Sequence, residues 1–198
     1  FDKALKLDHR NPDIQVERDA AARKAQALQL KAQGEKQMLA GMDEDAVKSL
    51  LASLALDPDN EVVAAEESEA EKRVAAAQLK AAGDQFMDDA EYQDAAEAYG
   101  KAAGLEPESE EIAKLWSDAL NRARAQELKA VAEHQAAAAD FNSAVDSFTA
   151  ALDYDPDNAE IKLELEDAKN KARSLQLKEI GEKEMADRDY KSAMETLL

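Results

Sequence analysis

The residues that could carry chemistry are few, and they form no pattern typical of a catalytic centre. The 198-residue chain has no cysteine and two histidines, His9 and His134. Without cysteine, disulfides, zinc–thiolate sites and thiol nucleophiles are excluded. No serine stands in a pattern with a base and an orienting acid. We therefore expect a protein that is not an enzyme, with no catalytic residue, cofactor or metal ion, and with both histidines at the surface.

One acidic segment is similar to the start of an EF-hand calcium loop. The segment 57–61 reads Asp-Pro-Asp-Asn-Glu. A complete loop needs glycine at its sixth position and glutamate at its twelfth, where this chain has Val62 and Ser68. A proline that stops one helix and an Asp or Asn that caps the next explains the segment better. We predict a structural turn, with weak adventitious calcium binding as the alternative.

The charge and the apolar residues exclude further classes of function. Asp and Glu number 44 against 25 Lys and Arg, a formal net charge of −19. Such a chain is repelled by nucleic acid and by anionic membranes. No apolar run approaches the roughly 20 residues that a membrane span requires. We expect partners that are neither nucleic acid nor membrane, and the sequence indicates no compartment beyond a slight preference for the cytoplasm.

The sequence repeats with a period of 49 residues. Leu56-Asp57-Pro58-Asp59-Asn60 returns in related form at 105–109 and 154–158, and a Gln/Glu-Leu-Lys tripeptide begins at 29, 78, 127 and 176. We expect a single repeat array over 1–198, cut from a longer array. Its predicted units are 10–58, 59–107, 108–156 and a partial 157–198, after the end of a preceding unit at 1–9.

Each unit contains a long and a short helical pattern. Ser109 is a good N-cap, and the apolar stripe Ile112, Trp116, Ala119 and Ala123 follows it at helical spacing. This pattern predicts a helix of about 28–30 residues, about 42–45 Å long. A short helix of about 13 residues follows, near 92–104 in the second unit, and the next proline stops it. The alternative is a kink near 122–125, which would give three helices per unit.

The second unit resembles the tetratricopeptide repeat, a helix-turn-helix of about 34 residues. The matching residues are Leu79, Ala82, Gly83, Phe86, Ala95, Tyr99, Ala102 and Pro107. The resemblance implies an all-α solenoid of helical hairpins in a right-handed superhelix, and it covers nearly the whole chain. The period exceeds that of the family by about 15 residues, which we expect to extend the first helix by about four turns. Gly83 and Ala95 are expected to let the two helices of a hairpin approach closely.

The resemblance also implies that the first helix of each hairpin lines a concave groove. The candidate groove residues are Lys31, Glu35, Met38, Lys80, Asp84, Met87, Lys129, Glu133, Lys178, Glu182 and Met185. A subgroup of the family clamps the C-terminal carboxylate of heat-shock chaperones with Lys and Asn. Here an acid replaces the Asn four residues after each Lys, so it can neutralise the lysine, and a carboxylate clamp is disfavoured. Two interpretations stay open: a solvated helix face, or an acidic groove for a basic or amphipathic helical peptide with the methionines as apolar contacts.

Trp116 departs most clearly from the repeat, since Arg18, Glu67 and Leu165 occupy the equivalent positions. It is either a core filler for one repeat interface or an exposed anchor for a partner. The leading functional hypothesis is a non-enzymatic protein–protein interaction scaffold with an acidic surface. The alternatives are a structural spacer or filament element and a chaperone-tail adaptor. Exposed apolar ends could also produce end-to-end self-association.

Overall fold

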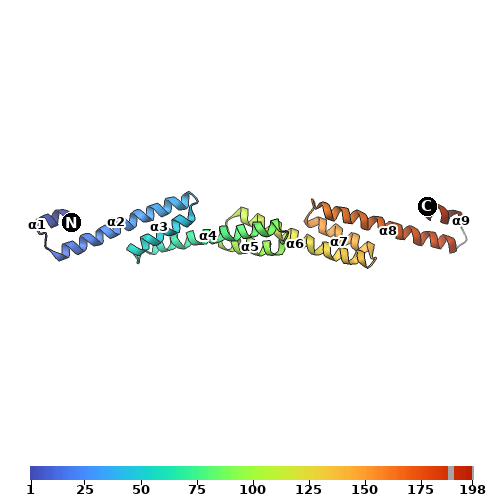
Figure 1. Cartoon of the computed structure of the whole chain (residues 1–198), viewed down its shortest axis with the longest axis horizontal. Coiled ribbons are helices and arrows are strands. Elements are labelled where there is room, and N and C mark those ends of the chain that lie inside the picture. The colour runs from blue at the N-terminus through green and yellow to red at the C-terminus, as the bar shows by residue number, and fades with distance from the viewer. Residues whose placement is uncertain (187–189, 198) are drawn as a thin grey trace. The chain divides into compact units, whose positions relative to one another are not determined.

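The computed structural model describes residues 1–186 and 190–197, and within them all regular secondary structure is helical, with no strand. Long and short helices alternate along the chain (Figure 1). The all-α prediction is confirmed for these residues. The helices are α1 (Asp2–Leu7), α2 (Pro12–Leu39), α3 (Asp43–Leu56), α4 (Glu61–Asp88), α5 (Tyr92–Leu105), α6 (Glu110–Ala137), α7 (Phe141–Tyr154), α8 (Ala159–Ala186) and α9 (Tyr190–Leu197).

The helix lengths agree with the expectation from the repeat. Helices α2, α4, α6 and α8 each have 28 residues, and α3, α5 and α7 each have 14. Helix α6 is continuous from Glu110 to Ala137. The alternative with three helices per unit is therefore wrong, because no Gly or Pro interrupts the helical hydrogen bonds near 122–125.

A polar cap begins each long helix at the same place in the repeat. The Asn60 side-chain oxygen accepts a hydrogen bond from the Val63 N–H at 3.3 Å, and its amide donates to Asp57 at 3.3 Å. Ser109 takes the same position before α6 and accepts from the Ile112 N–H at 3.4 Å. The acidic segment at 57–61 therefore has the hydrogen bonds of a turn and a helix cap, as predicted.

Two residues after the end of each of the first three long helices lies a residue with left-handed backbone. Gly41, Ala90 and Ala139 are equivalent in the repeat and have φ of 70°, 59° and 59°. In the second repeat the Glu91 N–H donates to the Phe86 carbonyl at 2.9 Å, closing the turn that ends the helix. This is the geometry of a glycine-type C-terminal cap. Alanine adopts it at a cost, because its Cβ crowds the backbone in this conformation.

The chain divides into two compact units. Unit 1 consists of 1–84 and 98–113, and unit 2 of 85–97 and 114–198. The division cuts α4, α5 and α6, so it does not follow the 49-residue repeat. Unit 1 contains a buried cluster of Ala46, Leu50, Val63 and Ala70.

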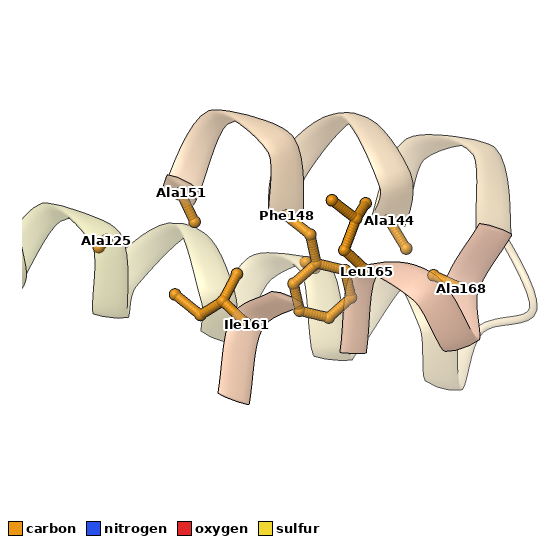
Figure 2. Packing of buried hydrophobic residues seen from close by; sticks show 8 residues of the cluster. Ala125, Ala144, Phe148, Ala151, Ile161, Leu165 and Ala168 are labelled. Atoms are coloured by element: carbon orange, nitrogen blue, oxygen red, sulfur yellow. The ribbon is translucent and has the colours of Figure 1, made fainter. Parts of the chain in front are cut away.

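The buried cluster of unit 2 joins three helices. Phe148 projects from α7, with Ile161 and Leu165 of α8 beside its ring (Figure 2). Ala125 of α6 belongs to the same cluster. Small side chains on α6 let the aromatic ring reach into the space between the helices, which is where most of the apolar burial of this hairpin arises.

Glycine permits the closest helix approach in unit 1. A Cβ at Gly83 would lie 2.6 Å from Cε1 of Tyr99, and one at Gly34 would lie 2.7 Å from Cγ of Leu50. These distances confirm the close approach predicted at Gly83. The Tyr99 ring thus rests on the long helix of its own hairpin. Ala95 is fully buried.

Candidate partner-binding surface

The lysines predicted to line a groove instead join successive long helices. Lys31 on α2 forms a hydrogen-bonded ion pair with Glu35 on its own helix and with Glu66 on α4 at 2.7 Å. Lys80 on α4 lies 3.3 Å from both Asp84 and Glu111, the latter on α6. We call each such lysine, with its own acid and the acid of the next long helix, a lysine node.

The third node is the most extensive. Lys129 on α6 pairs with Glu133 on its own helix and lies 3.2 Å from Glu160 and 3.1 Å from Glu164, both on α8. Its side chain is only 17% exposed. Lys178 differs, because its side chain is 64% exposed and lies 3.6 Å from Glu182. The predicted i,i+4 pairs are thus present in all four repeats, and the cross-helix acids extend the first three.

The cross-helix acid alternates between two repeat positions. Glu66 and Glu164 are equivalent, but Leu115 occupies that position in between. Glu111 and Glu160 are equivalent, but Val62 occupies that position in the first junction. Every one of the three nodes therefore keeps at least one acid on the following long helix, although neither position is acidic throughout.

The nodes hold their lysines in the charged form. The pKa of Lys31 is raised, first by the hydrogen bond to Glu35 and then by the one to Glu66. The pKa of Lys80 is raised by Asp84 and then Glu111, and that of Lys129 by Glu133 with further support from Glu164 and Glu160. Carboxylates of the chain itself thus satisfy these ammonium groups, which leaves them poorly suited to bind the carboxylate of a peptide.

The remaining groove candidates are placed differently from one another. Met38 is half-buried and packs against the cluster that contains Leu50 and Val63. Met87 is half-buried and Met185 is exposed. Asp84, besides its pair with Lys80, accepts a hydrogen bond from the Tyr99 hydroxyl at 2.7 Å.

Trp116 lies at the surface of unit 2. Its exposed fraction is 40%, whereas Leu165 at the equivalent position is only 7% exposed. Leu120, one turn further along α6, is also exposed. Of the two interpretations of Trp116, the structure therefore favours an exposed residue over a core filler. Its role as an anchor for a partner stays a prediction.

A groove between a short helix and the following long helix was not predicted from the sequence. It occurs in unit 1 between α3 and α4 and again in unit 2 between α7 and α8. The α3–α4 groove has a volume of about 430 Å³ and is lined by Glu44, Val47, Glu71, Val74, Ala75 and Gln78. The α7–α8 groove is lined at the equivalent positions by Asn142, Val145, Lys169, Ala172, Arg173 and Gln176. Aligning the repeats would have revealed the recurrent valine and glutamine, but not the concavity between them.

In the described part of the chain the two histidines lie at the surface and the possible metal ligands are not grouped. His9 and His134 are exposed, as predicted. Within residues 1–186 and 190–197, no group of three or more His, Asp or Glu side chains is placed to hold a metal ion. Nor does any helix described there have the length and apolar character to cross a membrane.

The comparisons with known proteins add no relative. No known protein family matches the chain, and no curated protein matches it. The resemblance to the tetratricopeptide repeat therefore depends on the residues of the chain itself.

Proposed function

We propose that this chain is a non-enzymatic scaffold of tetratricopeptide-like repeats that holds partner proteins on an acidic surface. In this proposal its hairpins stack as a right-handed superhelix with an extended first helix in each repeat. The partners are proteins or peptides with basic or amphipathic helical segments, because the chain carries a formal net charge of −19.

The observation that carries the proposal is a contrast between constant and variable repeat positions. The lysine and its i+4 acid are present in all four repeats, and three of these pairs reach a carboxylate on the next long helix. Other positions, at which most of the side chains are exposed, change completely from one repeat to the next. Two such positions, four residues apart, are occupied in successive repeats by Arg18 and Ala22, Glu67 and Glu71, Trp116 and Leu120, and Leu165 and Lys169. A solenoid that only sets the length of a protein needs the constant lysines and acids at its helix junctions. Surface chemistry that differs from repeat to repeat suits the binding of a partner.

A structural spacer or filament element is the second candidate, and the lysine nodes favour it. Stability in a repeat array is a sum of repeat and interface terms. Nodes that recur at every described junction would supply an interface term without any partner. A chaperone-tail adaptor receives no such support, because Lys31, Lys80 and Lys129 already bind carboxylates of the chain.

Affinity capture over a salt series tests the proposal. The immobilised chain is exposed to lysate at low salt, and a parallel sample is washed at about 1 M salt, where the Debye length is about 3 Å. Each captured protein is then purified and its binding to the chain is measured directly. We expect a direct partner with a basic binding segment whose affinity falls with salt. Absence of any direct partner at either salt would overturn the scaffold proposal and leave the spacer in its place.

A further inference from the structure

The α3–α4 groove combines an apolar floor with acidic edges. Val47 of α3 and Val74 and Ala75 of α4 are half-buried and form the floor. Glu44 and Glu71 are exposed and stand on the two helices that flank it. A concavity between two helices that is apolar at its base and charged at its edges has the form that accepts a third, amphipathic helix.

The negative charge at these edges is compensated only in part by the lysine beside them. Lys48 also lines the groove, and its ammonium pairs with Asp45 at 2.9 Å and also interacts with Glu44. Glu71 faces Glu67 one turn away on α4, and burial together with this neighbour raises the pKa of Glu67. A cation placed beside Glu71 would relieve the repulsion between the two carboxylates.

The equivalent groove of unit 2 keeps one valine and one glutamine and changes the other lining residues, including Val74, which Ala172 replaces. Val145 and Gln176 repeat Val47 and Gln78. Asn142 replaces Glu44, Lys169 replaces Glu71, and Arg173 replaces Ala75. The two grooves therefore differ in charge within one chain. The α3–α4 groove has Glu44 and Glu71 at its edges, whereas the α7–α8 groove has Arg173 and Lys169 there. Lys169 is paired to Glu166 at 2.7 Å, and Asp140 and Glu179 also lie in the lining of the α7–α8 groove.

We propose that the α3–α4 groove docks an amphipathic helix of a partner protein, with an apolar stripe flanked by lysine or arginine. The apolar stripe packs on Val47, Val74 and Ala75, and the basic side chains pair with Glu44 and Glu71. The inference rests on the proposed scaffold function, and it moves the binding site from the lysine positions to this groove. The α7–α8 groove rejects the same helix, because Lys169 and Arg173 repel its basic flanks.

Site-specific fluorescence can locate the docking, because the chain has no cysteine of its own. Gln78→Cys places an acrylodan label in the α3–α4 groove, and Gln176→Cys places it at the equivalent position of the α7–α8 groove. The probe is a synthetic helix of leucine, alanine and lysine, with the leucines along one face and lysines on both sides of it. We expect its binding to shift the emission of the label at 78 and to leave the label at 176 unchanged.

Matched substitutions separate a docking site from general attraction to an acidic chain. Glu44→Gln with Glu71→Gln removes the two edge charges of the groove. Glu17→Gln with Asp59→Asn removes two exposed charges of unit 1 outside it. The first pair should weaken probe binding about three- to tenfold, the loss expected for two exposed ion pairs. The second pair should leave binding within about twofold of wild type.

A transplant of the groove chemistry completes the test. Asn142→Glu, Lys169→Glu and Arg173→Ala give the α7–α8 groove the charges of its counterpart, and we expect the label at 176 to respond to the probe in that variant. Equal weakening by both charge pairs, equal response of both labels, or no binding to the wild-type chain would each overturn the docking site. If a direct protein partner is nevertheless captured, the scaffold function stands and only its location in this groove fails.

Discussion

Replacing Lys129 by methionine isolates the contribution of one lysine node. Methionine keeps an unbranched apolar stem of similar length but removes the ammonium group. In the wild-type chain that group pairs with Glu133 and lies within 3.2 Å of Glu160 and Glu164. The substitution leaves three carboxylates facing one another across α6 and α8 without their shared cation.

The expected loss of stability follows from how much water reaches the node. Exposed ion pairs contribute about 0–1 kcal/mol, and removing one partner of a buried pair costs about 3–5 kcal/mol. The Lys129 side chain is 17% exposed, so the node lies between these cases. We expect Lys129→Met to lower the free energy of unfolding by about 1.5–3 kcal/mol. Lys178→Met removes the same group at a site that is 64% exposed and should cost at most about 0.5 kcal/mol.

Urea unfolding measures both variants. Circular dichroism follows all the helices, and the fluorescence of Trp116, the one tryptophan, follows α6, the helix that carries Lys129. The pH dependence gives a second measurement. The pKa of Lys129 is raised in the folded chain, so its stabilisation is fully present below the ordinary lysine pKa of about 10.4 and disappears as the pH rises through the folded value. The gap between wild type and Lys129→Met should therefore narrow in strong alkali.

Equal stability of wild type and Lys129→Met would refute the node as a source of stability. Equal losses of unfolding free energy for Lys129→Met and Lys178→Met would also refute it, because the expected difference between the two variants comes from the cross-helix carboxylates of α8. An unchanged gap in alkali would show that the loss comes from side-chain packing and not from the ammonium charge.

Three further substitutions or measurements test other parts of the structure. Glu67→Gln should stabilise the chain by about 0.5 kcal/mol at neutral pH, because it removes like-charge repulsion from Glu71. The folded pKa of Glu67 is raised, so this gain should vanish as the pH falls through that value toward the ordinary one, and a constant gain would count against it. Ala139→Gly should stabilise by about 0.5–1 kcal/mol in thermal unfolding by relieving the positive φ, whereas Ala113→Gly within α6 should destabilise by about 1 kcal/mol. Trp116 should emit at long wavelength and be quenched by iodide and acrylamide, and a blue-shifted, protected emission would contradict its exposure.

The helices were predictable because local signals mark both ends of each one. Asn60 and Ser109 recur at the N-cap, a proline follows α3, α5 and α7, and the residues that face the core recur at helical spacing. The left-handed end of the long helix was predictable only where glycine stands, at Gly41. Its equivalents Ala90 and Ala139 have the same positive φ without any local signal. There the tertiary structure prevails over the preference of alanine for a right-handed backbone.

The contacts between helices were less predictable, because the residue types at two contacting positions change from repeat to repeat. Ser147 donates to Gln135 on the long helix at 2.7 Å, and a hydrogen bond of 2.7 Å also joins the equivalent Ser49 and Gln37 in the first repeat. The second repeat has Phe86 in place of the glutamine, so no single pair of side chains makes this contact in every repeat. The acids that the next long helix contributes to each lysine node also lie at no fixed number of residues from the lysine. The division into two units has no sequence signal, since it cuts through three helices.

The strongest argument for a scaffold over a spacer comes from positions whose residues lower the stability of the folded chain. Glu67 and Glu71 place two carboxylates one turn apart, and burial makes their repulsion worse. Trp116 and Leu120 leave two large apolar side chains exposed at the same two positions of the next repeat. A spacer gains nothing from either arrangement, since Leu165 shows that a buried leucine fits the first position. Unfavourable features of this kind concentrate where a protein contacts something else. Glu71 is one edge of the α3–α4 groove, so one of these two costs falls on the surface to which we assign partner binding.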